Sequence, residues 1–175
     1  MNRLGELTRK VDAFFDRVTA RHGTDMQCAT GCSDCCHVRL TVTGVEAGAI
    51  RALVSGWPDD RRRDLAATGP TDRCAALDPA GRCKIYDARP LVCRSHGVPI
   101  RLRQGGLPVV QACHRNFTRT PPDPDCILDQ ATLSATLLAV DAAAPRAAGP
   151  ELPRAAGAPG ERVELAGLLA DLAAI

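Results

Sequence analysis

The amino-acid sequence predicts a small, irregular α+β fold with a thin hydrophobic core. Three observations support this prediction. The chain has 175 residues, which suits one domain with tails. Only 3% of its residues are aromatic, and much of its 45% hydrophobic fraction is alanine, which buries little area. Helical periodicity alternates with short strand-like patterns. The core therefore needs a second source of stability.

Helical periodicity begins close to the N-terminus. Apolar residues predict an amphipathic helix over 3–21 that packs on the core through Leu4, Leu7, Val11, Phe14 and Val18. After a short strand over about 38–42, Thr43 and Glu46 form a capping-box pattern that opens a helix over 44–55. Pro58 begins a further short helix that ends near residue 69.

The second half of the chain is predicted to contain a hairpin and two helices. Apolar residues alternate on both sides of Gln104-Gly105-Gly106, which indicates a β-hairpin. Asp125 caps a predicted helix over 126–143. We expect an N-terminal helix, a cysteine-cluster domain, a flexible Ala/Pro/Gly linker and a C-terminal amphipathic helix, over residues 1–21, 22–144, 145–160 and 161–175.

Charge and hydropathy disfavour several classes of protein. A net charge of +2 and a pI of about 8.1 give no strong signature of nucleic-acid or membrane binding. No apolar run reaches the roughly 20 residues of a membrane span. The arginines are balanced by acidic residues, and the strands lack stacking aromatics, so nucleic-acid binding is not expected. The charged N-terminal segment does not resemble a secretory signal, which predicts a cytoplasmic location with reduced thiols.

Nine cysteines are the decisive feature of the sequence. Cys35 and Cys36 are neighbours, a poor arrangement for a disulfide but a suitable one for two metal bonds. The turn Asp78-Pro79-Ala80-Gly81 is expected to bring Cys74 and Cys83 face to face. Metal binding is predicted at eight thiolates, enough for two four-coordinate zinc sites or two four-iron clusters: Cys28, Cys32, Cys35, Cys36, Cys74, Cys83, Cys93 and Cys113.

Further ligands remain open at this stage. His37, His96 and His114 lie close to cysteines, and each is a candidate to replace a thiolate. Cys126, at a predicted helix start, is either a ligand or a small buried apolar residue. His22 is expected at the surface. Arg89 and Arg94 are the arginines we single out as donors to sulfur.

The motifs Cys28-x3-Cys32-x2-Cys35-Cys36, Gly81-Arg82-Cys83-Lys84-Ile85-Tyr86 and Arg89-Pro90-x2-Cys93-Arg94 resemble the YkgJ-like cysteine-cluster family, a zinc- or iron-chelating domain. The resemblance covers roughly residues 28–117. It implies metal ligands at Cys32, Cys35, Cys36, Cys83, Cys93 and Cys113, whereas Cys28 and Cys74 match less rigidly placed cysteines. Ser33-Asp34 departs from the family, where a Gly-containing pair is common. Related clusters occur in a flagellin lysine methylase with iron–sulfur character.

Two classes of function follow from these patterns. The first is a non-catalytic cytoplasmic metal-binding protein that chelates zinc or iron, with a [4Fe-4S] cluster as one form of iron. It would serve structure, metal handling or contact with a protein or peptide partner. The alternative is an iron-dependent or iron–sulfur enzyme that acts in redox chemistry or in peptide or protein modification. An open coordination position would distinguish the second class from the first.

Overall fold

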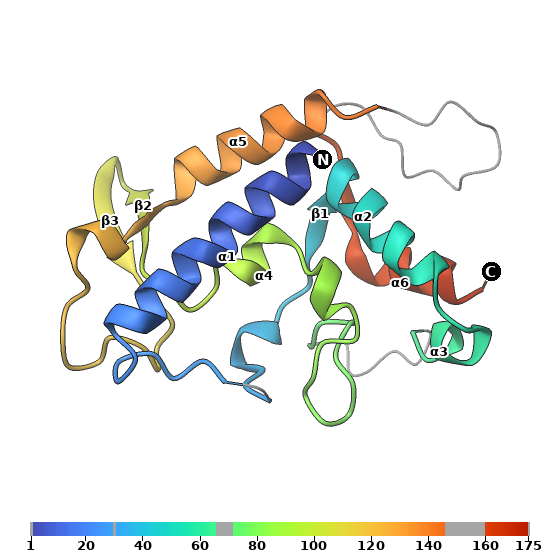
Figure 1. Cartoon of the computed structure of the whole chain (residues 1–175), viewed down its shortest axis with the longest axis horizontal. Helices are drawn as coiled ribbons and strands as arrows, with labels where there is room; N and C mark the ends of the chain where they lie inside the picture. Colours follow the sequence, from blue (N-terminus) through green and yellow to red (C-terminus); the bar gives the residue numbers. More distant parts are fainter. Residues whose placement is uncertain (1, 30, 66–71, 146–159, 175) are drawn as a thin grey trace. The chain divides into compact units, whose positions relative to one another are not determined.

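The computed structural model describes residues 2–29, 31–65, 72–145 and 160–174 (Figure 1). Helices and small sheets form two units, and each unit combines stretches that are distant in the sequence. Unit 1 comprises Met1–Ala29 and Leu91–Ala139, and unit 2 comprises Thr30–Pro90 and Val140–Ile175. The prediction of an irregular α+β fold is confirmed.

Unit 1 is organised around the N-terminal helix, whose predicted bounds are confirmed. Helix α1 (Arg3–Arg21) begins where the side chain of Asn2 accepts a 2.7 Å hydrogen bond from the Gly5 amide. The short helix α4 (Leu91–Arg94) packs on it, and Arg94 binds the Asp12 carboxylate at 2.8 Å. The core of this unit contains Val18, Met26, Val98 and Cys126.

A three-stranded sheet completes unit 1. The predicted hairpin is confirmed as β2 (Ile100–Gln104) and antiparallel β3 (Leu107–Gln111). Its two-residue turn needs glycine, because Gly105 and Gly106 have φ of +58° and +83°. Strand β4 (Leu128–Asp129) pairs in parallel with the other edge of β2.

The helix predicted over 126–143 begins later than expected. Pro124–Cys126 form the 3₁₀ turn η3, β4 follows, and helix α5 spans Gln130–Ala142. Asp129, not Asp125, accepts from the amide of Thr132 at 2.8 Å. Pairing with β2 extends the backbone at Leu128–Asp129, so the helix can start only after that strand.

Unit 2 contains helix α2 (Gly44–Ser55), which also has its predicted bounds and its capping box. The Thr43 amide donates to Glu46 Oε2 at 3.0 Å. Strand β1 (Thr41–Thr43) pairs antiparallel with β5 (Arg162–Glu164), and helix α6 (Leu165–Ala173) packs against α2. The core of the unit includes Ile50, Val54, Leu165, Leu168, Leu169 and Leu172.

Several predicted boundaries in unit 2 are corrected. The strand expected over 38–42 is only Thr41–Thr43, and helix α3 is only Asp59–Arg63. The predicted C-terminal helix starts with a strand, because Val163 pairs with Val42 before Glu164 caps α6 by accepting from the Gly167 amide at 2.7 Å. Most of the expected linker, 146–159, lies outside the described residues, as does 66–71.

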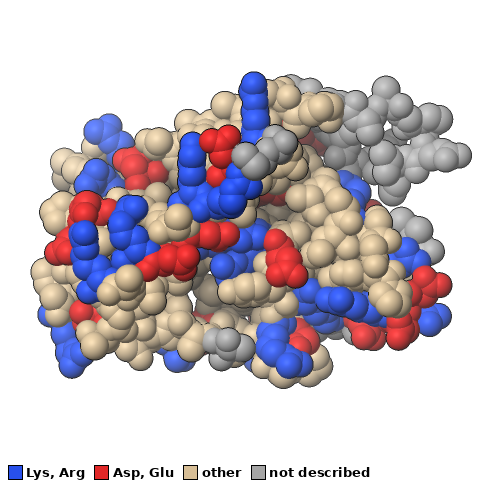
Figure 2. Space-filling view, viewed as in Figure 1, with Lys and Arg blue, Asp and Glu red and all other residues tan. Residues whose placement is uncertain are grey.

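The surface carries both signs of charge. On the face drawn in Figure 2, acidic side chains lie beside basic ones and the two signs are interspersed. Within the part of the chain that the structure describes, every helix is too short or too polar to cross a membrane.

Two neighbouring positions on α2 should respond to alanine in opposite directions. Ile50 is fully buried, so Ile50→Ala should lower the free energy of unfolding by about 2–5 kcal/mol. Gly48 is exposed, and a Cβ there meets nothing within 4 Å, so Gly48→Ala should raise it by about 0.5–1 kcal/mol. Denaturant unfolding of both variants measures this. A destabilised Gly48→Ala variant would contradict the helix assignment.

Candidate metal centres

The nine cysteines divide between the two units. Unit 2 holds the five thiols Cys32, Cys35, Cys36, Cys74 and Cys83. Unit 1 holds the four thiols Cys28, Cys93, Cys113 and Cys126. The eight predicted ligands are therefore split between the units, with five in unit 2 and three in unit 1.

A single 3₁₀ turn arranges the adjacent pair in unit 2. Turn η1 (Asp34–Cys36) is closed by the Cys36 amide, which donates to the Ser33 carbonyl at 2.8 Å. It leaves the Sγ atoms of Cys35 and Cys36 4.0 Å apart. The carbonyl of Cys36 accepts a 2.7 Å hydrogen bond from the amide of Cys74. This backbone bond fastens the pair to a cysteine almost forty residues later in the chain.

The predicted turn at Asp78 brings Cys83 back toward the same place. The Asp78 carboxylate accepts from the amides of Ala80 at 2.9 Å and Arg82 at 2.8 Å. Cys83 forms a β-bridge with Leu77, and the Lys84 amide donates to the Ala76 carbonyl. The turn is confirmed, although the direct cross-strand partner of Cys83 is Leu77 and not Cys74.

The mutual effects of Cys35, Cys74 and Cys83 on their thiol pKa values indicate that these three side chains lie near one another. Burial raises the pKa of both Cys74 and Cys83, and the nearby Cys35 raises both further. Cys74 also raises the pKa of Cys83. Like-charge repulsion of this kind requires that the sulfur atoms be near one another. A cation among them would offset both the burial and the repulsion.

Two arginines singled out from the sequence have different surroundings. The positive charge of Arg89 lowers the pKa of Cys83, and its guanidinium lies 4.1 Å from the centre of the Tyr86 ring in η2 (Tyr86–Ala88). Arg94 binds Asp12 in unit 1. Arg89 therefore favours the thiolate form of Cys83, whereas the salt bridge of Arg94 is with the carboxylate of Asp12; donation from either arginine to a sulfur stays a prediction.

Cys32 is half-buried beside the Asp78 turn. Its neighbour Ser33 has its Oγ 3.4 Å from the position that a Cβ on Gly81 would occupy. Gly81 has φ +77°, so glycine permits both the turn and this approach. The loop that bears Cys32 thus meets the turn that delivers Cys83.

In unit 1, one buried asparagine ties two cysteines together. The Nδ2 of Asn116 donates to the Sγ of Cys28 at 3.3 Å and to the carbonyl of Gly97 at 2.7 Å. Its Oδ1 accepts from the Gln27 amide at 2.8 Å, and its own amide donates to the Cys113 carbonyl at 2.8 Å. Asn116 therefore fixes Cys28 beside the segment that bears Cys113.

Gly97 makes room for the Cys28 sulfur. A Cβ at Gly97 would lie 2.6 Å from the Sγ of Cys28, and the residue has φ +104°. Both facts require glycine. Cys93 lies in α4, four residues before Gly97, so the short stretch from Cys93 to Gly97 reaches the sulfur of Cys28. Three cysteine-bearing segments thus converge in unit 1.

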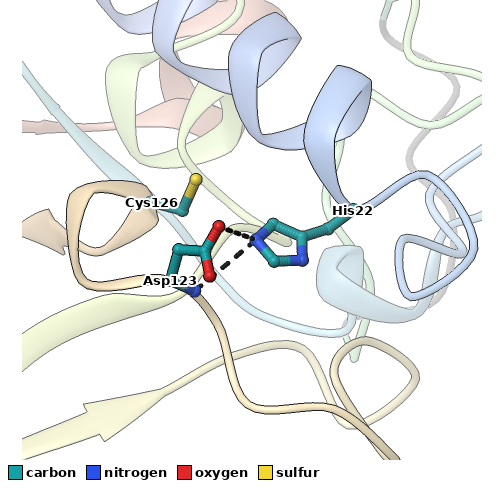
Figure 3. Close-up of side chains that lie close together, drawn as sticks. All are labelled: His22, Asp123 and Cys126. Carbon is teal, nitrogen blue, oxygen red and sulfur yellow. Dashed lines mark hydrogen bonds and ion pairs between the residues drawn. The ribbon is translucent and has the colours of Figure 1, made fainter.

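One of the four histidines differs from its sequence prediction, and the candidate ligand roles of the other three stay predictions. His37, His96 and His114 are all exposed. His22, expected at the surface, is buried and lies with Asp123 and Cys126, as Figure 3 shows. Cys126 is fully buried in the unit 1 core, which is compatible with both of its predicted roles, a small packed residue and a metal ligand; it lies in η3 and not at the start of a long helix. Sequence reasoning missed this group because about a hundred residues separate His22 from Asp123 and Cys126.

Comparison with known proteins gives one match. A family model described as "CxxCxxCC: Putative zinc- or iron-chelating domain" matches residues 27–114. No curated protein and no solved structure matches the chain. The matched range includes every cysteine from Cys28 to Cys113 and excludes His22, Asp123 and Cys126.

Gly97 offers a test of the unit 1 arrangement. Gly97→Ala should displace the Cys28 sulfur and reduce the metal retained against a chelator several-fold, because the new Cβ would overlap Sγ. Gly106→Ala is the matched control, since Gly106 also has positive φ but nothing lies within 4 Å of its Cβ position. Both variants carry roughly 1–2 kcal/mol of backbone strain. Equal metal retention in the two variants would contradict the convergence on Cys28.

Proposed function

The chain belongs to the CxxCxxCC family, and from this premise we propose that it binds zinc or iron at two thiolate centres, one within each unit. We propose a non-catalytic metal-binding role in a reducing, cytoplasmic compartment, where thiols stay available as ligands. The Arg89-Pro90-x2-Cys93-Arg94 motif supports placing the chain in the YkgJ-like part of the family.

The gathering of four thiols in unit 2 is the observation that carries this proposal. Cys35 and Cys36 have adjacent sulfurs, a backbone hydrogen bond joins Cys36 to Cys74, and Cys83 interacts electrostatically with Cys35 and Cys74. Four thiolates complete a tetrahedral zinc site or hold one four-iron cluster. Cys32 is the fifth thiol of this unit and lies beside the same turn.

The unit 1 centre has a different composition. Cys28, Cys93 and Cys113 supply three thiolates, with Asn116 donating to the sulfur of Cys28. A hydrogen bond to a ligand sulfur orients the ligand and stabilises its negative charge. The fourth position is left for a ligand outside this set, for which the exposed His96 and His114 are the nearest in sequence.

This incomplete thiolate set favours one second candidate function. An ion with three protein ligands and an open position can bind and activate a substrate or water. The alternative is therefore an iron-dependent or iron–sulfur enzyme that acts in redox chemistry or in peptide or protein modification, with the unit 1 centre as its reactive site. In the non-catalytic role, a protein or peptide partner would instead exchange metal or make contact here.

Metal removal tests the proposal as a whole. A strong chelator should abolish cooperative melting, because structural zinc contributes on the order of 10 kcal/mol, comparable with the 5–15 kcal/mol stability of a typical domain. Circular dichroism before and after chelation measures the loss, and elemental analysis with the visible spectrum of anaerobically purified protein identifies the metal. Unchanged melting after complete removal would refute a structural role. A brown protein would indicate iron–sulfur clusters, and a colourless one with zinc would indicate zinc sites.

Metal retention should also depend on pH. Burial raises the pKa of Cys74 and Cys83, so protons compete strongly with the ion for both thiols. Affinity should fall as pH falls below neutral and rise as pH increases toward the raised pKa. Chelator competition at several pH values measures this trend, with Cys74→Ser and Cys83→Ser each expected to flatten it. A pH-independent affinity would mean that these thiols are not ligands.

A further inference from the structure

His22, Asp123 and Cys126 form a compact group in unit 1, apart from the residues matched by the family model (Figure 3). One ligand atom from each residue lies within 4.8 Å of the other two: an imidazole nitrogen, a carboxylate oxygen and the thiol sulfur. The side chain of His22 is 9% exposed and Cys126 is 0% exposed, whereas the side chain of Asp123 is 49% exposed. Two ligand atoms are therefore buried and the third borders solvent.

We propose that these three residues bind one additional divalent metal ion, with zinc as the best match, and leave a fourth position open to water. One nitrogen, one oxygen and one sulfur ligand suit zinc, which accepts all three donor types, and they suit magnesium or calcium poorly. The proposal goes beyond the cysteine centres, because none of its residues lies between 27 and 114.

The contact between His22 and Asp123 has the spacing expected of two ligands of one ion. Asp123 Oδ2 lies 3.4 Å from His22 Nε2. Ligands about 2.0–2.1 Å from a tetrahedral zinc are about 3.3–3.4 Å apart along the edge of the tetrahedron. The same separation is long for a charge-assisted hydrogen bond, which favours about 2.7–2.9 Å. The sulfur of Cys126, within 4.8 Å of both atoms, would need to approach by up to about 1 Å.

The hydrogen bond at Nε2 supports an unprotonated nitrogen there. The amide of Asp123 donates to Nε2 at 3.5 Å, a long contact that only an unprotonated Nε2 can accept and that a bound ion would replace, because the nitrogen has one lone pair. The lone pair of an unprotonated Nε2, however, also lies close to the carboxylate oxygen Oδ2 of Asp123. A cation between the two electron-rich atoms removes this repulsion, and a metal ion does so without protonating the ring.

The surrounding charges favour a cation. The Nη1 of Arg21 binds both carboxylate oxygens of Asp125 at 2.7 and 2.6 Å, and lies farther from Asp123 Oδ2 at 3.6 Å and Cys126 Sγ at 3.9 Å. Arg17 also contacts this turn, at the Asp125 carbonyl. The two guanidinium charges equal the two carboxylate charges, so a thiolate at Cys126 leaves one net negative charge, which attracts a cation.

Burial of the thiol argues against a different use of the same three residues. A thiol, an imidazole and a carboxylate in contact can also form a nucleophilic triad. A nucleophile must reach its substrate, and Cys126 is fully buried in the core with Val18, Met26 and Val98. The half-exposed carboxylate of Asp123 instead gives an ion, or a water bound to it, access to solvent.

Metal stoichiometry of the full chain tests the proposal. The protein is loaded with zinc, dialysed and analysed for zinc per chain, alongside the variants Asp123→Asn, His22→Gln and Cys126→Ala. Each variant should hold about one equivalent less than the wild type, and Asp16→Asn, a change at an exposed carboxylate on α1, should hold the same amount as the wild type. Cobalt loading adds a second readout, because losing this site removes one thiolate and leaves most of the sulfur-to-cobalt absorption.

Asp123→Asn is the deciding variant, because its side chain borders solvent and the change preserves shape; circular dichroism checks that it folds. Equal zinc in folded Asp123→Asn, folded His22→Gln and wild type would overturn the proposal and leave His22 and Asp123 as a structural pair. The same measurement tests the cysteine centres independently. If those centres bind no zinc, the wild type holds a single equivalent of zinc, and these variants lose it. If the variants retain the cysteine-bound zinc in full and lose one equivalent, both proposals stand.

Discussion

Bringing several thiolates together in a partly buried place is unfavourable unless a cation lies among them. Cys74 and Cys83 show this directly, because burial raises the pKa of each thiol and neighbouring cysteines raise it further. A metal ion reverses the balance by stabilising every thiolate that it binds. Under the proposed function, an ion bound among the unit 2 thiols would supply the positive charge that stabilises their thiolate forms.

Tight turns and single hydrogen bonds, more than regular secondary structure, position the thiols in both units. In unit 2 these are the 3₁₀ turn at Asp34–Cys36, the Asp78 turn and the hydrogen bond from Cys74 to Cys36. In unit 1 the equivalent role falls to the Asn116 side chain and to Gly97. Such local devices specify position with few residues, which suits a chain that has only 3% aromatic residues to build a core.

The parts of the fold that could be predicted are those specified by local chemistry. Helices α1 and α2 have their predicted ends because the Asn2 cap and the Thr43–Glu46 capping box are encoded within one helical turn. The hairpin follows from Gly105-Gly106 in the same way. Prediction failed where a distant strand decided the conformation: Leu128–Asp129 pair with β2, and Val163 pairs with Val42.

The candidate thiolate ligands were recognisable from spacing, but their division between two units and the burial of His22 depend on contacts across the whole chain.

The residues matched by the family model contain only part of the apolar core that supports them. Unit 1 buries Val18 from α1 and Cys126 from η3 against Val98, and the first two lie outside 27–114. Unit 2 buries Leu165, Leu168 and Leu169 from α6 against the α2 residues Ile50 and Val54. At roughly 1.5–3 kcal/mol for each buried large aliphatic side chain, these flanking helices supply a substantial part of the hydrophobic stabilisation. The segment that carries the cysteines therefore has two sources of stability, the ions it binds and the helices on either side of it. The flanking helices therefore add hydrophobic stability to the turns and loops that carry the cysteines, and the bound ions are proposed to supply the rest.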